Sequence, residues 1–300
     1  MVLHNTPITY EEELKKNPDL KESDVQMLRE WCAKQPHLPK ISDVQLALFL
    51  YNNYYSVETT KSKIDLYYTM RTHLPEFFSN RDPLGSKQLL IAYKNVFFTY
   101  LEQPTHDGYD VIYCKIMDLS DYDYNATIKY ICMLHDLWAH THGSSLGYVA
   151  VVNAQGLTLA QAMRISPMGL KKFLLYVQEA VPIRPKRVYF INCTPSMDIV
   201  TRMMKPFMKK KLLEMSHFHA TIETVTKSIP LDALPNEDGG KAGNVADLAA
   251  NAVKWVEDNR AWFQTEEATM RVNESLRPGK PQTSTDLFGV EGSFKKLEID

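Results

Sequence analysis

Two hydrophobic patterns follow one another along the chain. Between Tyr10 and Phe78 apolar residues recur with a helical period, and Ser23 and Ser42 stand where helix N-caps are expected. From residue 84 to residue 240, short apolar runs alternate with amphipathic stretches. The first pattern predicts a small all-helical domain, and the second predicts an α/β layer fold.

Three of the apolar runs predict β-strands. They are continuous and rich in β-branched residues, which is typical of parallel strands buried on both faces, and they span residues 109–117, 147–153 and 187–192. A helix is expected over residues 126–140, between the first two strands. A second helix, between the last two, is expected to end near Pro182, because proline cannot continue a helix.

Segment 196–215 combines a methionine-rich apolar stripe with cationic residues. At helical spacing the stripe holds Met197, Val200, Met203, Met204, Phe207 and Met208. Methionine adapts to irregular partners, and an apolar stripe beside lysines is typical of helices that meet lipid headgroups. We interpret the segment as one amphipathic helix that forms a mobile lid. The alternative is an ordinary helix that packs on the core with a solvated basic face.

The C-terminal part reads as a helix followed by a breaker-rich tail. The helix is expected over residues 245–263, and the tail begins at Arg277. The tail is expected to dock in extended form on its own domain, because it keeps the apolar residues Leu287, Phe288, Val290, Phe294 and Leu297. The predicted units are therefore a helical domain (1–80), an α/β domain (81–242) and a C-terminal helix with its tail (243–300).

Composition narrows the possible partners and compartments. The 34 Lys and Arg residues nearly balance the 36 Asp and Glu residues, so no overall charge favours nucleic acid and any basic site is local. No apolar run approaches a membrane span, the N-terminus does not resemble a signal peptide, and Val2 stands where myristoylation needs glycine. Scattered cysteines favour reduced thiols, so we expect a cytoplasmic protein.

Two motifs suggest chemistry that the pattern around them disfavours. The run 143–147 matches G-x-S-x-G with Ser145 at the nucleophile position, but a hydrolase elbow needs a strand before the serine and a helix after it. The predicted order here is the reverse. Five histidines could suggest a metal site, but their spacing is not a known ligand pattern: His135, His140, His142, His217 and His219. Asp118, Asp121 and Asp123 are interpreted as a turn and a helix cap. We expect no enzyme, metal or cofactor.

Several short motifs, taken in their order and spacing, resemble those of the CRAL-TRIO lipid-binding family, in particular its tocopherol- and retinaldehyde-binding branch. They are Phe49-Leu50, Ile165-Ser166-Pro167, the run 188–195 that ends in Pro195, Lys205-Pro206-Phe207 and the run 234–240. The tail is similar to that of insect members. The resemblance implies a helical N-terminal domain, a mostly parallel sheet flanked by helices, an apolar cavity closed by a lid helix, and no catalysis.

The resemblance also implies a basic cleft for phosphoinositides, which Arg184, Lys186 and Lys211 would form. Further cations of the same surface are Arg187, Lys205, Lys209 and Lys210. This chain departs from the family's pattern at four positions. Tyr51 and Asn53 replace cations, Met215 stands where a basic residue can occur, and Asn153 replaces an aspartate. Losing such cations weakens phosphate binding, since they donate charge-assisted hydrogen bonds.

Strand alternation and helix period together predict the cavity lining. The expected residues are Tyr130, Leu134, Tyr148, Val152, Ile165, Phe173, Tyr176, Val177, Ile183, Val188, Phe190, Val200, Met203 and Phe207. The tyrosines could hydrogen-bond a ligand, or they could be ordinary core residues. We expect a carrier that binds one small hydrophobic lipid and transfers it at membranes, on which it is transiently peripheral. The alternative is a phosphoinositide-dependent adaptor or a phosphatidylinositol transfer protein.

Overall fold

A five-stranded sheet forms the centre of the molecule. The structure, a computed structural model, describes residues 3–118 and 120–289. The strand order is β1-β2-β3-β4-β5; β1 is antiparallel to β2, and the other neighbours are parallel. The strands are β1 (Val96–Tyr100), β2 (Asp110–Ile116), β3 (Tyr148–Asn153), β4 (Pro185–Ile191) and β5 (Ser216–Phe218).

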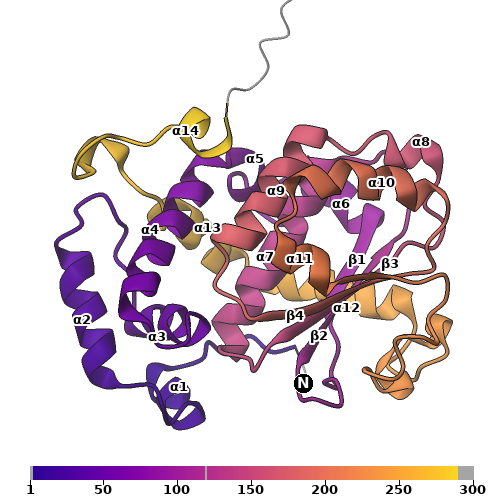
Figure 1. Ribbon diagram of the computed structural model, residues 1–300, viewed down its shortest axis with the longest axis horizontal. Coiled ribbons are helices and arrows are strands. Elements are labelled where there is room, and N and C mark those ends of the chain that lie inside the picture. Colours follow the sequence, from indigo (N-terminus) through magenta and orange to yellow (C-terminus); the bar gives the residue numbers. More distant parts are fainter. Residues whose placement is uncertain (1–2, 119, 290–300) are drawn as a thin grey trace, which may run out of the picture.

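A helical region precedes the sheet and lies at one end of it (Figure 1). Its helices are α1 (Tyr10–Lys16), α2 (Glu22–Ala33), α3 (Asp43–Asn52), α4 (Val57–His73) and α5 (Pro75–Phe78). The cap signals read from the sequence act as expected at α3, where Ser42 and Gln45 form a capping box. The predicted cap at Ser23 is wrong, since α2 begins one residue earlier and Lys21 is its N-cap.

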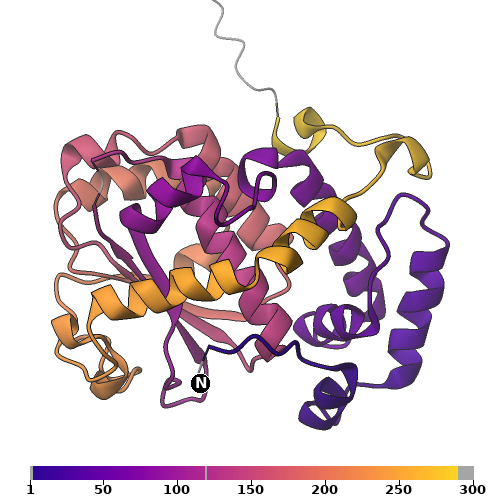
Figure 2. The same cartoon turned by 180° about the vertical axis from the view of Figure 1, so that it is seen from behind.

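Helices cover one face of the sheet and parts of its edges. They are α6 (Lys87–Asn95), α7 (Tyr124–His142), α8 (Leu159–Ala162), α9 (Pro167–Glu179), α10 (Ser196–Met204) and α11 (Lys210–Met215), with a 3-10 turn at Lys205–Phe207 between the last two. Behind the sheet, α12 (Val245–Asp258) and α13 (Arg260–Thr269) run toward the helical region (Figure 2). Further 3-10 turns lie at Leu231–Ala233, Asn236–Asp238 and Glu274–Leu276, and α14 spans Ser284–Phe288.

A buried group of charged residues joins the helical region to the α/β domain. Arg71 of α4 is 1% exposed and makes two hydrogen bonds to Asp136 of α7, at 3.0 and 2.8 Å, and one to Glu266 of α13 at 2.8 Å. Arg81 bonds the same two carboxylates. Charges of this kind are tolerated in the interior only when each is paired. The pairing therefore fixes α4, α7 and α13 relative to one another.

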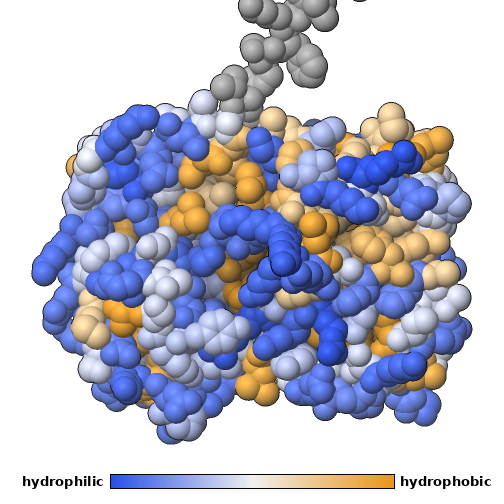
Figure 3. All heavy atoms as spheres, in the orientation of Figure 1, coloured by the Kyte–Doolittle hydropathy of each residue, from blue (hydrophilic) through white to orange (hydrophobic). Residues whose placement is uncertain are grey.

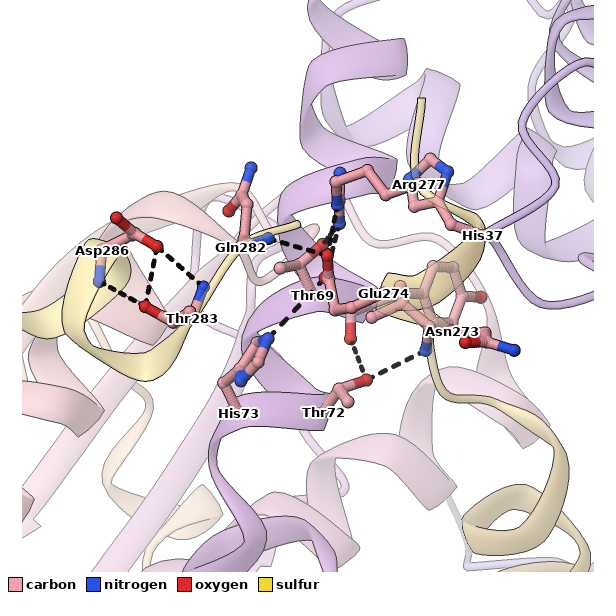
Figure 4. Close-up of polar contacts among 12 residues, drawn as sticks. His37, Thr69, Thr72, His73, Asn273, Glu274, Arg277, Gln282, Thr283 and Asp286 are labelled. Carbon is pink, nitrogen blue, oxygen red and sulfur yellow. Dashed lines mark hydrogen bonds and ion pairs between the residues drawn. The ribbon is translucent and has the colours of Figure 1, made fainter. Parts of the chain in front are cut away.

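The C-terminal segment is tied to α4 by a second polar group (Figure 4). Arg277 donates to both oxygens of Asp65, at 2.8 and 2.9 Å, and to Thr69 at 2.6 Å. Glu274 accepts from Arg277 and from the backbone of Gln282. The side chain of Phe288 is buried in the cluster that also holds residues of α9. The tail thus contacts the domain through Phe288, and α14 is helical where the sequence predicted an extended segment. Residues 290, 294 and 297 lie outside the described residues.

The predicted strands and helices agree with the structure within one to three residues, with three differences. The helix expected over 245–263 is two helices that change direction at Asn259. The lid expected as one helix over 196–215 is interrupted, because Pro206 lacks the N–H that would continue α10. The sequence analysis missed β1, which directly follows α6 with no turn residue between them.

The charged group predicts a specific loss of stability in acid. Burial alone would raise the pKa of Glu266, but Arg71, Arg81 and Arg271 lower it to about 2, and the pKa of Asp136 is lowered in the same way. A carboxylate with a depressed folded-state pKa stabilises the protein above about pH 4.3, and the contribution is lost as pH falls toward 2. We expect Glu266→Gln to lower the free energy of unfolding at pH 7 by about 3–5 kcal/mol.

The variant should also show a shallower decline of stability between pH 4.5 and 2, measured by urea unfolding. Glu58→Gln is the control, because the Glu58 side chain is 82% exposed. An identical decline in wild type and Glu266→Gln would contradict the role assigned to this carboxylate.

Candidate functional site

The two faces of the sheet differ in how closely they are packed. On one face, Val111, Tyr113, Val149 and Val151 are buried against the segment that follows β5 and the start of α12. On the other face the strand register aligns two rows across three strands: Ile112, Ala150 and Val188, and Cys114, Val152 and Phe190. Of these six, all except Phe190 are only half-buried. Helices cover this second face, and the strand side chains beneath them remain partly accessible.

The helices above this face present half-buried apolar side chains of their own. They are Ile131 from α7, Phe173 and Val177 from α9, Ile199 and Met203 from α10, and Phe207 from the turn. Burial by the surrounding protein raises the pKa of the Cys114 thiol to about 12. Because these covered side chains are still only half-buried, we infer an apolar space between the sheet and the helices, which we call the sheet-face space.

Most of the predicted cavity residues gather around the sheet-face space. Val152, Ile165, Phe173, Val177, Ile183, Val188, Met203 and Phe207 are half-buried there, and Tyr176, Phe190 and Val200 are buried in the same cluster. Sequence reasoning missed Ile112, Cys114, Ile116 and Ile131. The alternation of buried and half-buried residues along β2 indicates the first three, but the predicted lining included no residue of β2.

Tyr130, Leu134 and Tyr148 belong to a neighbouring cluster formed with α6, β1 and α12. The Tyr130 ring contacts Tyr93, and the Tyr148 ring contacts Tyr100. Ile112, Cys114, Ile131 and Ile183 also pack against this cluster, so it adjoins the sheet-face space. Because α7 is buried on nearly all sides, its apolar period does not reveal that Tyr130 and Leu134 pack on this cluster.

Two neighbouring polar side chains of α9 contact the lid. Gln178 donates to the carbonyl of Phe207 at 2.9 Å and accepts from the backbone N–H of Lys209 at 2.7 Å. Glu179 forms an ion pair with the Lys209 side chain. The apolar residues Met197, Val200, Met204 and Met208 are buried below. The lid therefore rests on dispersion contacts and on polar contacts with Gln178 and Glu179.

Large apolar side chains are exposed on the elements next to this lid. Leu159 and Met163, on and just after α8, are 56% and 69% exposed, and α8 packs on α10. Leu213 of α11 and Phe218 of β5 are also exposed. In Figure 3 hydrophilic side chains lie over the middle of this face with hydrophobic ones on both sides. Apolar residues interspersed with lysines are typical of surfaces that meet lipid. Sequence reasoning did not find Leu159 and Met163.

Among the cations predicted for the basic cleft and its surface, Arg184, Lys186 and Arg187 contact other side chains of the protein. The guanidinium of Arg184 lies 3.7 Å from the ring of Tyr51 and 4.3 Å from the ring of Tyr54, and it donates to the Tyr51 carbonyl. Lys186 lies 5.0 Å from the Tyr109 ring. Arg187 pairs with Asp107 at 3.6 Å. Tyr51, which replaces a family cation, thus holds Arg184 against the helical region.

The remaining cations surround the end of α9. Lys209 pairs with the Glu179 side chain, and Lys63 of α4 donates to the Glu179 carbonyl. Burial lowers the pKa of Lys63; Glu179 opposes this effect, and Lys209 and Lys211 add to it. The side chains of Lys205, Lys210 and Lys211 are exposed. The exposed positive charge of this region therefore lies on the lid lysines rather than on Arg184.

Asn153, a departure from the family's pattern, belongs to a buried polar group. Its amide donates to Tyr113 at 3.0 Å and to Asp238 at 3.1 Å, and its oxygen accepts from Asn192. Asp238 comes from the run 234–240, where a side chain at Gly240 would collide with the Leu234 carbonyl. The acidic group missing at position 153 is thus supplied by Asp238.

The side chains that suggested catalysis or metal binding have structural roles. Ser145 donates to the Gly147 carbonyl in the turn that leads from α7 to β3, so helix precedes strand as expected. His135 bonds Tyr100, His140 stacks on Trp262 and His142 stacks on Trp138. Within the described part of the chain, no group of three or more His, Cys, Asp or Glu side chains could hold a metal ion. Asp123 caps α7, which confirms its predicted role.

The contacts of Arg184 with Tyr51 and Tyr54 predict that Arg184 contributes to folding stability rather than to headgroup binding. We expect Arg184→Ala to lower the free energy of unfolding by about 1–2 kcal/mol, because two cation–π contacts are lost. Sedimentation with vesicles that contain phosphatidylinositol bisphosphate should change little. Lys211→Ala, the matched exposed cation, should instead weaken sedimentation and leave stability unchanged. A loss of vesicle binding in Arg184→Ala with unaltered stability would contradict this assignment.

Three comparisons with known proteins agree with this architecture. The family model described as the CRAL/TRIO domain matches residues 94–240, and the one described as a Pinta-like UBA domain matches residues 17–88. The chain is 27% identical to the mouse α-tocopherol transfer protein-like protein over 249 residues, which cover 81% of this chain and 71% of that one. It is 23% identical to rat clavesin-2 over 282 residues, which cover 90% and 85%.

A solved structure supports the fold. The crystal structure of Sfh5 superposes with a TM-score of 0.50 at 14% identity, over 80% of this chain and 90% of that one. In the part of the chain that the structure describes, no helix combines the length and apolar character needed to cross a bilayer. The chain contains a CRAL-TRIO domain, which the family model places at residues 94–240.

Proposed function

We propose that this chain is a non-enzymatic intracellular carrier of one small hydrophobic lipid. The observation that carries the proposal is the sheet-face space, where apolar rows of three strands are covered by helices and are still half-buried. An apolar ligand that removes such a surface from water gains about 25 cal/mol per Å². The strand and helix side chains named around the space are apolar, which favours a neutral ligand of tocopherol or retinoid size over a phospholipid. A relative named α-tocopherol transfer protein-like supports the same class.

Exchange of the ligand is proposed to occur at a membrane, where the lid moves. The α10–α11 segment is attached to α9 through Gln178 and through the ion pair of the partly exposed Lys209 and Glu179 side chains, and its other contacts there are apolar. Exposed Leu159 and Met163 lie beside it. Contact with lipid would bury these side chains and bring the lid lysines to anionic headgroups. In this proposal the protein is cytoplasmic and only transiently peripheral on membranes.

Membrane docking is tested by making the exposed apolar surface charged. We expect the double variant Leu159→Asp, Met163→Asp to slow lipid transfer between vesicles at least tenfold, because carboxylates are excluded from the bilayer interface. Binding of a fluorescent tocopherol analogue in solution should be unchanged. The matched control is Leu84→Asp, Leu276→Asp, whose side chains are 52% and 50% exposed far from the lid. Equal slowing in both double variants would contradict docking through α8.

Opening of the lid is tested at its polar attachment. Gln178→Ala removes both contacts to the turn between α10 and α11, so we expect release of the bound analogue to accelerate about three- to tenfold, in line with two lost hydrogen bonds. The exposed Gln264→Ala is the control. Release measured by stopped-flow fluorescence that is equally fast in wild type and Gln178→Ala would place the exit route elsewhere.

A further inference from the structure

A second, smaller pocket lies between the helical region and the α/β domain. Its volume is about 100 Å³, and its walls come from α3, α4, α7 and α13. The residues that matter below are Leu48 and Asn52 of α3, Arg71 of α4, Ala139 of α7 and Trp262 of α13. Neither the sheet rows nor α9, α10 and α11 contribute to this lining. The pocket is therefore separate from the sheet-face space, and we call it the junction pocket.

Two lining residues have a buried polar atom with no hydrogen-bond partner among the described residues. Arg71 is 1% exposed, and its terminal nitrogens are occupied by Asp136, Glu266 and Tyr176, but its Nε is unpaired. The Oδ1 of Asn52 is unpaired as well, although its amide nitrogen donates to the Leu48 carbonyl. Leaving such a donor or acceptor unsatisfied costs about 1–3 kcal/mol each. The junction pocket therefore offers one donor and one acceptor to an occupant.

The remaining walls of the junction pocket combine apolar and polar side chains. Leu48, Ala139 and Trp262 are apolar over most of their surface, whereas Gln45, Tyr67 and His140 add polar groups. An apolar cavity of about 150 Å³ is known to hold benzene, so a somewhat smaller, partly open pocket accepts a single ring at its limit. A ring with one hydroxyl group fits both kinds of wall.

The charge of the occupant follows from the group next to it. The charged lining residues Arg71, Asp136 and Glu266 are already paired with one another and with Arg81 and Arg271, so an ion in the junction pocket would be buried without an unpaired counter-ion. The occupant is therefore neutral. A hydroxyl both accepts and donates a hydrogen bond, which matches the Nε of Arg71 and the Oδ1 of Asn52.

We propose that the junction pocket is a second ligand site, which takes a neutral, ring-sized phenol or aromatic alcohol and is distinct from the site of the carried lipid. Its hydroxyl bonds Arg71 or Asn52, and its ring packs on Leu48 and Trp262. Because the walls come from both sides of the junction, binding strengthens the attachment of the helical region to the α/β domain.

The test uses phenol as the probe and toluene as the matched ring without a hydroxyl. Binding to the lipid-free full-length chain is followed by ligand-detected NMR and by the thermal unfolding midpoint. We expect saturable binding of phenol to one site, at least tenfold tighter than that of toluene, with a rise in the unfolding midpoint. Ala139→Leu should abolish it by filling the junction pocket, and Leu48→Phe serves as a second filling variant should Ala139→Leu not fold.

Val152→Phe is the control, because it fills the sheet-face space and should leave phenol binding intact. This control also keeps the two proposals apart, since it should impair binding of the tocopherol analogue. Absence of saturable phenol binding would mean that the junction pocket holds water only and would overturn the proposal. Equal affinity for toluene, or binding that survives both filling variants, would overturn it too.

Discussion

The buried pairing of Arg71 and Arg81 with Asp136 and Glu266 is the interaction on which the arrangement of the molecule depends. Each partner comes from a different segment, so no unit can shift without leaving a charge unpaired in the interior. Arg71 also donates to the hydroxyl of Tyr176, which extends the constraint to α9. The helical region, α7, α9 and α13 are therefore held in a fixed arrangement around the sheet.

Two parts of the molecule differ in the kind of contact that holds them. The charged junction and the tail are held by ion pairs, and in the tail Arg277 joins the C-terminal segment to α4. The helices α10 and α11, which we propose to move, contact the rest mainly through apolar side chains, with Gln178 and the Lys209–Glu179 pair. Dispersion contacts are non-directional and can be exchanged for contacts with lipid tails, whereas buried ion pairs cannot. Exchange of an apolar ligand requires a segment that can open, which we propose to be α10 and α11, beside a part of the fold that stays fixed.

The strands β2, β3 and β4 and most helices could be predicted from the sequence, whereas the strand β1 and the interruption of the lid were not predicted. Continuous apolar runs identified β2, β3 and β4, since strands buried on both faces have no competing pattern. The strand at 96–100 was not predicted, because it follows α6 directly and a short apolar run beside a helix cannot be distinguished from that helix by its pattern. The interruption of the lid at Pro206 was visible in the sequence, and the methionine period on both sides obscured it.

Long-range pairing explains the rest of what sequence reasoning missed. The sequence shows Tyr51 as the loss of a cation. In the structure its ring also stacks on Arg184, so that a second cation is engaged within the fold. Asn153 was read as the loss of a carboxylate that Asp238 supplies from 85 residues further along the chain. The stripe of α7 that faces the sheet is set by neighbours on all sides rather than by its own period. Such pairings depend on the tertiary fold, which local pattern does not encode.

The central claim is that the sheet-face space carries one neutral lipid, and native mass spectrometry of the purified chain tests it most directly. Protein purified from cells should carry one extractable apolar lipid per chain, and Val152→Phe should be purified without it while remaining folded. A folded wild-type chain that carries no lipid, and takes none from mixed vesicles, would contradict the account.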